Sequence, residues 1–564
     1  MSGDSKEQGD AVVVEERWDP PGPGTWTADE SHFTRTITPL IADLMAASAT
    51  AGVEEGMELV GAPLRTMEVR FVEGQMYRKL VPIVGGDSGP KRPPPPWLSR
   101  LAFKVVPALR RRARLAADAL ENKSFRDEAE RWEMRWRPDL VEANRAFAAI
   151  DLASLSEVDL ADHLERLIGH LAASIQLHFR LHISDLGPIG FLLDATREWG
   201  IDDVDAMAML AGASPETSAP HDELGPIART VAAAGVDVDS LTALEAVRAV
   251  SDEVAGLLDA YLVDYGARLT GGYDIVDLTL AEMPEVILAS LRDDRHLTGR
   301  TAAAEAEERG QAAISRLRER VPVGERDRFD ELVADARRLY GLRDENGPIT
   351  YEWPAGVLRT SLLELGTRAV DAGHLLEAAH VMELERGEVD ELAHGRLAVG
   401  ADEVAARRPV REARRGRRAP MVLGPDPVEP DLAGLPDEMA TMMRISIDVV
   451  ELLEATPDVA ALSGTGIGTE SYRGRARVVA DADEALLRIE PGDVIVTRLT
   501  VPTFNSVLAV AGAVVTEHGG LLCHTAVIAR ELGIPAVVGA SGALDLPDGA
   551  EVEVDPVAGV VTVL

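Results

Sequence analysis

The stretch that decides the fold of the C-terminal part is VTEHGGLLCHTAVIARELGIPAVVG, residues 515–539. The apolar run Gly512–Thr516 predicts a strand, Gly519 and Gly520 predict a tight turn, and TAVIAREL after His524 has helical spacing. His524 should therefore lie at or near the first turn of a helix. Glycines let the backbone approach an anion closely, and the N–H groups at a helix N-terminus favour negative charge. The pattern suits a nucleophilic or phosphate-carrying histidine, but for a lone histidine an ordinary βα unit that happens to contain one is the more common case.

The whole stretch resembles the swivelling phosphohistidine domain of the phosphoenolpyruvate-utilising enzymes, which include pyruvate phosphate dikinase, phosphoenolpyruvate synthase, enzyme I of the sugar phosphotransferase system and rifampin phosphotransferase. The shared pattern is met by Thr516, Gly519, Gly520, Cys523, His524, Ala526, Val527, Ala529, Arg530, Ile534, Pro535, Ala536, Val537 and Gly539. The resemblance covers residues 462–564 and includes GRARVV (474–479), EPGDVIV (490–496) and Thr500-x-Pro502. It implies an α/β fold in which His524 carries phosphate.

The same resemblance suggests which residues support the carrier histidine. They are Gly519, Gly520, Thr516 and Arg530, together with Thr503, which falls where enzyme I has a threonine partner of its histidine. Cys523, the single cysteine, could be a nucleophile in principle, but the family accepts Ser, Thr or Cys at this position. We expect a small packed side chain there.

Composition limits the class of protein. The chain has 564 residues, enough for two to four domains, and 46% hydrophobic residues, as in globular proteins. Its net charge of −38 makes nucleic acid and anionic membranes poor partners. One cysteine excludes an internal disulfide and a multi-cysteine zinc site. Without a secretory signal or an apolar run of about 18 residues, the expected location is the cytoplasm.

The sequence predicts a multidomain protein, in which a largely α-helical substrate-binding domain precedes the α/β swivelling domain. We expect a disordered tail over 1–17, the helical domain over 18–399, an Arg- and Pro-rich swivel linker over 400–460 and the phosphohistidine domain over 461–564. Within the helical domain, residues 64–80 alternate like a hairpin that turns at Glu73-Gly74. Ser156 to Asp159 looks like a helix cap, followed by one apolar stripe, which comprises Leu160, Leu164, Leu167, Ile168, Leu171 and Ile175.

The segments 265–291 and 337–375, with Trp26 to Pro39, resemble the substrate-binding domain of rifampin phosphotransferase-type enzymes. In that family the segment matching Arg343-Asp-Glu345 faces the phosphate during transfer. Many members have a lysine where this chain has Gly347. An exposed helix-end ion pair is the alternative for Arg343 and Glu345. The candidate substrate-binding residues are Glu345, His32, His178 and Arg268.

Other ligand sites have weak signals. His178 and His182 stand four apart on an expected helix, near His163 and His170, but no adjacent glutamate or cysteine completes a metal motif, so we predict no metal site. The sequence has no G-x-x-x-x-G-K-[ST], and the run 464–468 (GTGIG) lacks the third glycine of a dinucleotide loop. A structural turn is the better interpretation of that run.

Neither an ATP-grasp domain nor a phosphoenolpyruvate-binding barrel is recognised in this sequence, an arrangement similar to the two-subunit phenylphosphate synthases. The resemblance therefore implies ATP and Mg²⁺ on a partner, an ATP-grasp subunit, and a phosphotransferase that passes a phosphoryl group through His524 to an alcohol or phenol. The candidates for the general base are His32, Glu345 and His178. Two alternatives stay open: a dehydratase or lyase that activates a hydroxyl by transient phosphorylation, and a non-enzymatic phosphocarrier or regulatory protein.

Overall fold

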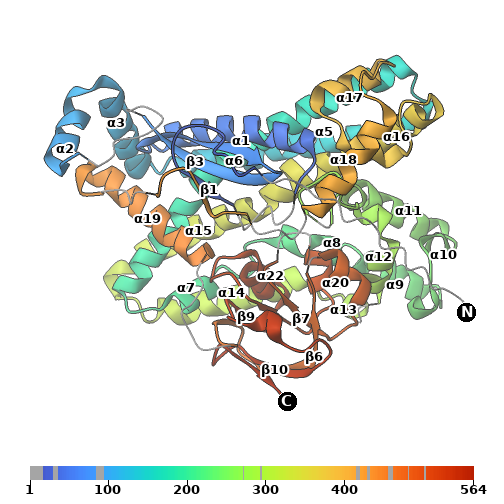
Figure 1. Cartoon of the computed structure of the whole chain (residues 1–564). Coiled ribbons are helices and arrows are strands. Elements are labelled where there is room, and N and C mark those ends of the chain that lie inside the picture. The colour runs from blue at the N-terminus through green and yellow to red at the C-terminus, as the bar shows by residue number, and fades with distance from the viewer. Residues whose placement is uncertain are drawn as a thin grey trace, which may run out of the picture.

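A computed structural model describes residues 17–29, 36–83, 94–270, 272–292, 295–414, 419–427, 432–454, 462–480, 482–500 and 504–564. Figure 1 shows a large helical region above a compact α/β unit, which contains the C-terminus. We call residues 17–454 the helical region and residues 462–564 the C-terminal domain. The multidomain order, with helices first and an α/β fold last, is confirmed.

The helical region contains a small sheet among many helices. Its helices are α1 (Pro39–Leu59), α2 (Pro96–Val105), α3 (Pro107–Asn122), α4 (Phe125–Arg131), α5 (Arg137–Ala148), α6 (Glu157–Glu198), α7 (Asp203–Ala208), α8 (Ala219–Asp222), α9 (Gly225–Ala233), α10 (Leu244–Arg248), α11 (Asp252–Tyr261), α12 (Pro284–Leu291), α13 (Arg295–Thr298), α14 (Ala302–Arg318), α15 (Arg326–Gly347), α16 (Trp353–Asp371), α17 (Arg386–Ala393), α18 (Ala401–Ala413) and α19 (Asp437–Glu454). Its strands are β1 (Trp26–Ala28), β2 (Leu64–Val72), β3 (Gln75–Pro82) and β4 (Val422–Leu423), in the order β2-β3-β1-β4. The hairpin expected at Glu73-Gly74 is present, because β2 and β3 pair antiparallel with Val72 opposite Gln75.

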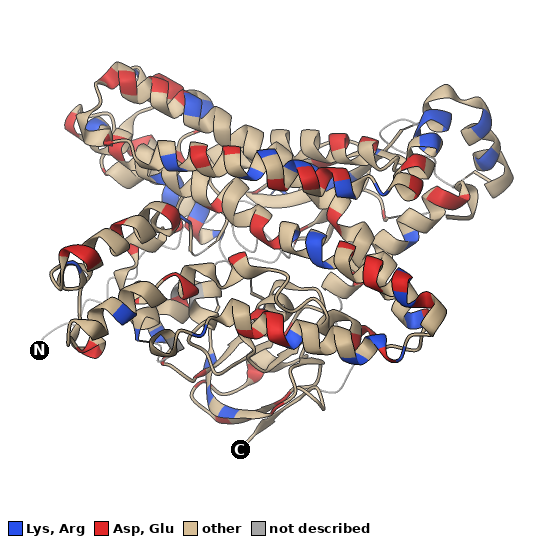
Figure 2. Cartoon of the chain, turned by 180° about the vertical axis from the view of Figure 1, so that it is seen from behind, with Lys and Arg blue, Asp and Glu red and all other residues tan. Residues whose placement is uncertain are grey.

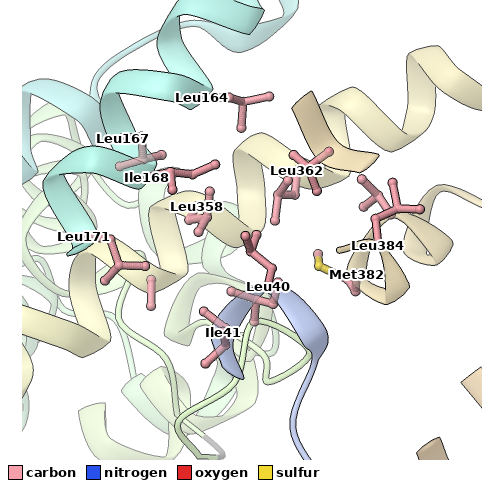
Figure 3. Close-up of a cluster of buried hydrophobic side chains, with 14 of the residues drawn as sticks. Leu40, Ile41, Leu164, Leu167, Ile168, Leu171, Leu358, Leu362, Met382 and Leu384 are labelled. Atoms are coloured by element: carbon pink, nitrogen blue, oxygen red, sulfur yellow. The ribbon is translucent and has the colours of Figure 1, made fainter. Parts of the chain in front are cut away.

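The long helix α6 organises the helical region. Its predicted cap is correct: the Ser156 side chain accepts a hydrogen bond from the backbone N–H of Asp159. The expected apolar stripe is buried, and α6 packs against α1, α15, α16 and α19. Figure 3 shows part of the resulting core, where Leu164, Leu167, Ile168 and Leu171 of α6 lie close to Leu358 and Leu362 of α16 and to Leu40 and Ile41 of α1. This core holds α16 against α6 and α1.

The C-terminal domain is a seven-stranded sheet with short helices. The strands are β5 (Thr465–Ile467), β6 (Tyr472–Val478), β7 (Val494–Thr497), β8 (Ala513–Thr516), β9 (Ala536–Val538), β10 (Glu551–Asp555) and β11 (Val560–Val563), and the helices are α20 (Ala482–Arg488), α21 (Asn505–Leu508) and α22 (His524–Leu532). The strand order is β11-β10-β6-β7-β8-β9-β5, and the central strands β6, β7, β8 and β9 are parallel. The GTGIG run does not form the turn that we expected, because its middle residues form β5, which pairs antiparallel with β9.

The structure differs from the expectation of a linker over 400–460. Two helices and a strand lie in this range: α18, β4, which pairs with β1 of the first sheet, and α19, which packs on α6. The Arg-rich run that we expected to belong to the linker forms ion pairs: Arg407 pairs with Glu388, and Arg411 pairs with the buried Glu383. These ion pairs hold α18 against neighbouring segments, although its polar composition is typical of a linker.

Acidic and basic residues are interspersed along the helices in Figure 2, so the net charge of −38 is spread over the molecule. Many of these charges are paired, as Arg318 is with Asp330 and Arg338 with Glu133. Among the described residues, no helix combines the length and the apolar character needed to cross a membrane.

Candidate phosphohistidine site

His524 lies where the sequence predicted, at the first residue of α22. The preceding strand β8 is fully buried between β7 and β9, so the position of its end is fixed. The chain then turns through Gly519, whose φ of +120° suits only glycine, and a Cβ there would lie 2.7 Å from Sγ of Cys523. The turn brings the imidazole to the N-terminal end of α22, where free backbone N–H groups favour an anion.

Both ring nitrogens of His524 are hydrogen-bonded inside the C-terminal domain. Nδ1 lies 2.8 Å from Oγ1 of Thr500, which is itself 2.7 Å from Oγ1 of Thr525. Nε2 lies 2.8 Å from Oδ1 of Asn505, the first residue of α21. Burial lowers the pKa of His524 to about 3, because the charged imidazolium loses hydration. The ring is therefore neutral near pH 7, which is the state required of a nucleophile.

Two of the predicted support residues, Thr516 and Gly520, lie at the start of and within the loop before α22. Thr516 ends β8 with its side chain fully buried, and its hydroxyl has no hydrogen-bond partner among the described residues. The backbone N–H of Gly520 donates to the carbonyl of Leu453 at the end of α19, across the boundary between the two parts. Thr503 and His32 lie outside the described residues, so the roles suggested for them stay predictions.

Arg530 faces the helical region, six residues after His524 on α22. Its guanidinium donates to the Tyr340 hydroxyl on α15 at 3.1 Å and to the carbonyl of Leu521 in the glycine loop. These contacts connect the loop to α15. Support of a phosphoryl group by Arg530 itself stays a prediction.

The side chain of Cys523 packs at the N-terminus of α22. It belongs to the apolar surroundings of the C-terminal core, and burial raises the pKa of its thiol. A thiol with a raised pKa is a poor nucleophile. These contacts agree with the packing role that we expected.

The C-terminal domain is docked on the helical region through α22. Gly212 donates its backbone N–H to both carboxyl oxygens of Glu531 at 3.1 Å, and Arg309 of α14 donates to the carbonyls of Arg530 and Glu531. An apolar cluster also crosses the boundary, with Leu521, Leu522 and Val527 packed among residues of α6, α7, α14, α15 and α19. Figure 1 accordingly places α22 on the side of the sheet toward the helices. His524 is therefore held close to the helical region.

The segment that we expected to face phosphate forms the end of α15. Arg343 donates to Asp185 of α6 at 3.0 Å. Glu345 accepts from Arg137 at 2.8 Å and from the indole N–H of Trp132, and burial raises its pKa. The two residues therefore form separate interactions with other helices and do not pair with each other.

Buried carboxyl groups gather beside this segment. Asp344 accepts from the Ser214 hydroxyl, and burial raises its pKa to about 6. Glu352 ends the π-helical segment η8 (Pro348–Glu352), and burial raises its pKa to about 8. Arg268, a predicted substrate-binding residue, donates to Glu216 at 2.7 Å. Arg268 and Glu345 thus lie in one polar cluster, since Glu216 raises the pKa of Glu345 and Arg268 lowers that of Glu352.

His178 forms part of a hydrogen-bonded row on α6. Its Nδ1 is 3.0 Å from Oγ1 of Thr350, and its Nε2 is 3.0 Å from Nε2 of His182, whose Nδ1 is 2.8 Å from the Asp185 carboxylate. Because Asp185 also accepts from Arg343, the row connects two of the predicted residues, His178 and Arg343. Both ring nitrogens of His178 and of His182 are thus within hydrogen-bond distance of other protein groups.

Sequence reasoning missed Thr500 and Asn505 as partners of His524. The sequence pattern includes Thr500 only within the Thr500-x-Pro502 segment and points to Thr503 as the partner. The position of Thr500 could have indicated this role. Thr500 lies three residues after the end of the buried strand β7, and β7 is parallel to β8, so the C-terminal ends of the two strands lie side by side. Nothing in the sequence alone indicated Asn505.

Comparisons with known proteins agree with this architecture. A family model described as PEP-utilising enzyme, mobile domain, matches residues 489–559, and one described as rifampicin phosphotransferase fourth domain matches residues 184–344. A rifampicin phosphotransferase from Streptomyces sp is 31% identical over 323 residues, which are 55% of this chain and 35% of that protein. The phosphoenolpyruvate synthase of Escherichia coli (strain K12) is 48% identical over 92 residues, 16% of this chain and 12% of that protein.

A third relative aligns over nearly the whole chain. Chondramide synthase cmdD from Chondromyces crocatus is 26% identical over 569 residues, 96% of this chain but 14% of that protein. The chain spans about a third of the length of the rifampicin phosphotransferases that it matches. The mobile domain around His524 and the rifampicin-phosphotransferase-like segment in the helical region therefore make both parts of the chain similar to phosphoenolpyruvate-utilising enzymes.

Proposed function

We propose that the chain is a phosphotransferase component in which His524 carries a phosphoryl group to an alcohol or phenol bound by the helical region. The phosphoryl group comes from ATP, which binds with Mg²⁺ on a separate ATP-grasp protein. The observation that carries the proposal is the neutral imidazole at the first residue of α22, directly after the Gly519-Gly520 turn. A lone pair on this ring can attack phosphorus, and the helix N-terminus stabilises the anion that results.

The docked position of α22 supports transfer to the helical region. Polar side chains of α15 and its surroundings, among them Asp344 and Arg343, lie close to the face that α22 contacts through Tyr340. We propose that Arg343 and the α22 amides offset negative charge on the phosphoryl group during transfer. Docking would also exclude water from the phosphohistidine, which water otherwise hydrolyses.

Movement of the C-terminal domain supplies the other half of the cycle. A carrier that visits two sites must leave the helical region to meet its donor. We propose that the C-terminal domain moves as a unit, while α18, β4 and α19 stay packed on the helical region. The relatives support this scheme, since one matching model is named a mobile domain and two relatives are named rifampicin phosphotransferases.

The acceptor hydroxyl also needs a general base. Among the proposed candidates, Glu345 is already held by Arg137 and Trp132, and His178 is held by Thr350 and His182. Either residue must therefore exchange one of these protein partners for the acceptor hydroxyl before it can take the proton.

The test follows labelled phosphate through both steps. The chain, an ATP-grasp protein and β- or γ-labelled ATP with Mg²⁺ should give acid-labile, base-stable label on the chain, and a panel of alcohols and phenols should then receive it. A phosphoester detected by ³¹P NMR supports the proposal. Release of inorganic phosphate with an unsaturated product identifies a lyase instead, and label that no small molecule removes identifies a phosphocarrier for another protein.

A further inference from the structure

Asn505 distinguishes the two nitrogens of the carrier ring. Nδ1 of His524 points to Thr500, which is 4% exposed, whereas Nε2 points to the carboxamide of Asn505. The same Asn505 lines a small cavity between the two parts of the molecule, opposite Thr217 and Ser218 of the helical region. Nε2 is therefore the nitrogen on the side of the cavity.

We propose that Asn505 is a positioning residue that controls whether Nε2 of His524 carries a proton or a lone pair, and that its amide then holds the phosphoryl group. The inference rests on the proposed function of His524 as the phosphate carrier. A carboxamide suits this role because it has a hydrogen-bond acceptor on one side and a donor on the other.

In the docked structure, Nε2 of His524 carries the ring proton and is unreactive. Oδ1 of Asn505 can only accept, so Nε2 donates its proton to Oδ1. Nδ1 of the neutral ring then accepts from the Thr500 hydroxyl, and Thr500 accepts from Thr525. In this tautomer Nε2 has no lone pair and cannot attack phosphorus.

Turning over the carboxamide gives the reactive state. The NH₂ group now faces Nε2, the ring proton is on Nδ1 and is donated to Thr500, and Thr500 donates to Thr525. The lone pair of Nε2 forms the N–P bond while the P–O bond of the ATP donor breaks, and the electron pair leaves on the nucleotide oxygen. Afterwards the NH₂ group donates to a phosphoryl oxygen.

Potassium phosphoramidate tests this inference without a partner protein, because it transfers its phosphoryl group to histidine and releases ammonia. The key variant is Asn505→Asp, which keeps the shape of the side chain but can only accept. It should be phosphorylated about tenfold more slowly at neutral pH than the parent, and the rate should recover at higher pH as the stabilised imidazolium loses its proton. Asn505→Leu should be slow at every pH, and Asn505→Ser, with a hydroxyl that donates and accepts, should restore part of the rate.

Nitrogen-15 NMR of histidine-labelled protein gives a second measurement that is independent of phosphorylation. The resonances of His524 are those absent from His524→Ala, and in the parent they should show a proton on Nε2 and none on Nδ1. A parent ring protonated on Nδ1, or an Asn505→Asp rate within twofold of the parent, would overturn the role of Asn505. If the parent takes up no phosphoryl group at His524 at any pH, the proposed function fails, and the NMR result still decides which nitrogen Asn505 caps.

Discussion

Replacement of Glu531 by glutamine should make docking of the C-terminal domain stronger at pH 7 and less dependent on pH. Glu531 is 1% exposed at the boundary, where its carboxyl accepts from Gly212 and is repelled by Asp344. Burial, with the charge of Asp344, raises the pKa of Glu531 from 4.5 to about 8. The nearby Arg530 and Arg309 lower it only in part, and Tyr340 is itself held neutral by a raised pKa.

The size of the effect follows from these two pKa values. In the undocked domain Glu531 meets water and should return to its ordinary pKa of 4.5, so docking at pH 7 requires uptake of a proton. One pH unit corresponds to about 1.4 kcal/mol, and the interval from 4.5 to 7 therefore costs about 3 kcal/mol of docking free energy. Because the docked pKa is raised, the favourable contribution is complete below pH 4.5 and is lost as the pH rises to about 8. Asp344, with a pKa raised from 3.8 to about 6, acts in the same direction.

Fluorescence energy transfer between the two parts measures docking directly. Val323 on the helical region and Val557 on the C-terminal domain are 80% and 76% exposed and can be replaced by cysteine for labelling in a Cys523→Ser background. The docked fraction should fall between pH 5 and pH 8 in the parent and stay high in Glu531→Gln. The exposed Glu551→Gln is the matched control and should follow the parent. A docked fraction that does not depend on pH in the parent, or a Glu531→Gln curve that coincides with it, would refute the reasoning.

The remaining predictions concern the histidine loop. Gly519→Ala should destabilise the C-terminal domain by about 1–3 kcal/mol in thermal unfolding and reduce labelling of His524, since its φ of +120° and the 2.7 Å approach to Cys523 leave no room for a Cβ; unchanged stability would contradict the account of the turn. Arg530→Met should weaken docking by about 1–3 kcal/mol because the Tyr340 hydroxyl and the Leu521 carbonyl lose their donor, and energy transfer identical to the parent's would contradict this. Cys523→Ser should retain phosphohistidine formation, whereas complete loss with intact folding would indicate a cysteine nucleophile.

The strand, turn and helix around His524 could be predicted because each step depends on local chemistry. The apolar residues Ala513 to Val515, two glycines and a helical repeat lie within a single short stretch, and β8 and α22 begin and end close to where those signals change. The stripe of α6 and the hairpin at Glu73-Gly74 were predictable for the same reason.

Features that depend on contacts between distant residues could not be predicted. Asn505 is 19 residues from His524, and Glu531 meets Gly212 across 319 residues. Composition was misleading over residues 400–460, because the arginines of α18 find carboxylates on other segments. The partners of Arg343, Glu345 and Arg268 likewise come from other helices, so a motif could locate these residues but not their interactions.

The most direct test of the central claim is to locate the phosphoryl group on the protein during turnover. Chain supplied with ATP, Mg²⁺ and an ATP-grasp protein is digested at alkaline pH, which preserves phosphohistidine, and is sequenced by tandem mass spectrometry. The account predicts one phosphoryl group on His524 in the parent, its loss on addition of the acceptor and its absence in His524→Ala. Phosphate on another residue, or acceptor turnover that continues in His524→Ala, would contradict it.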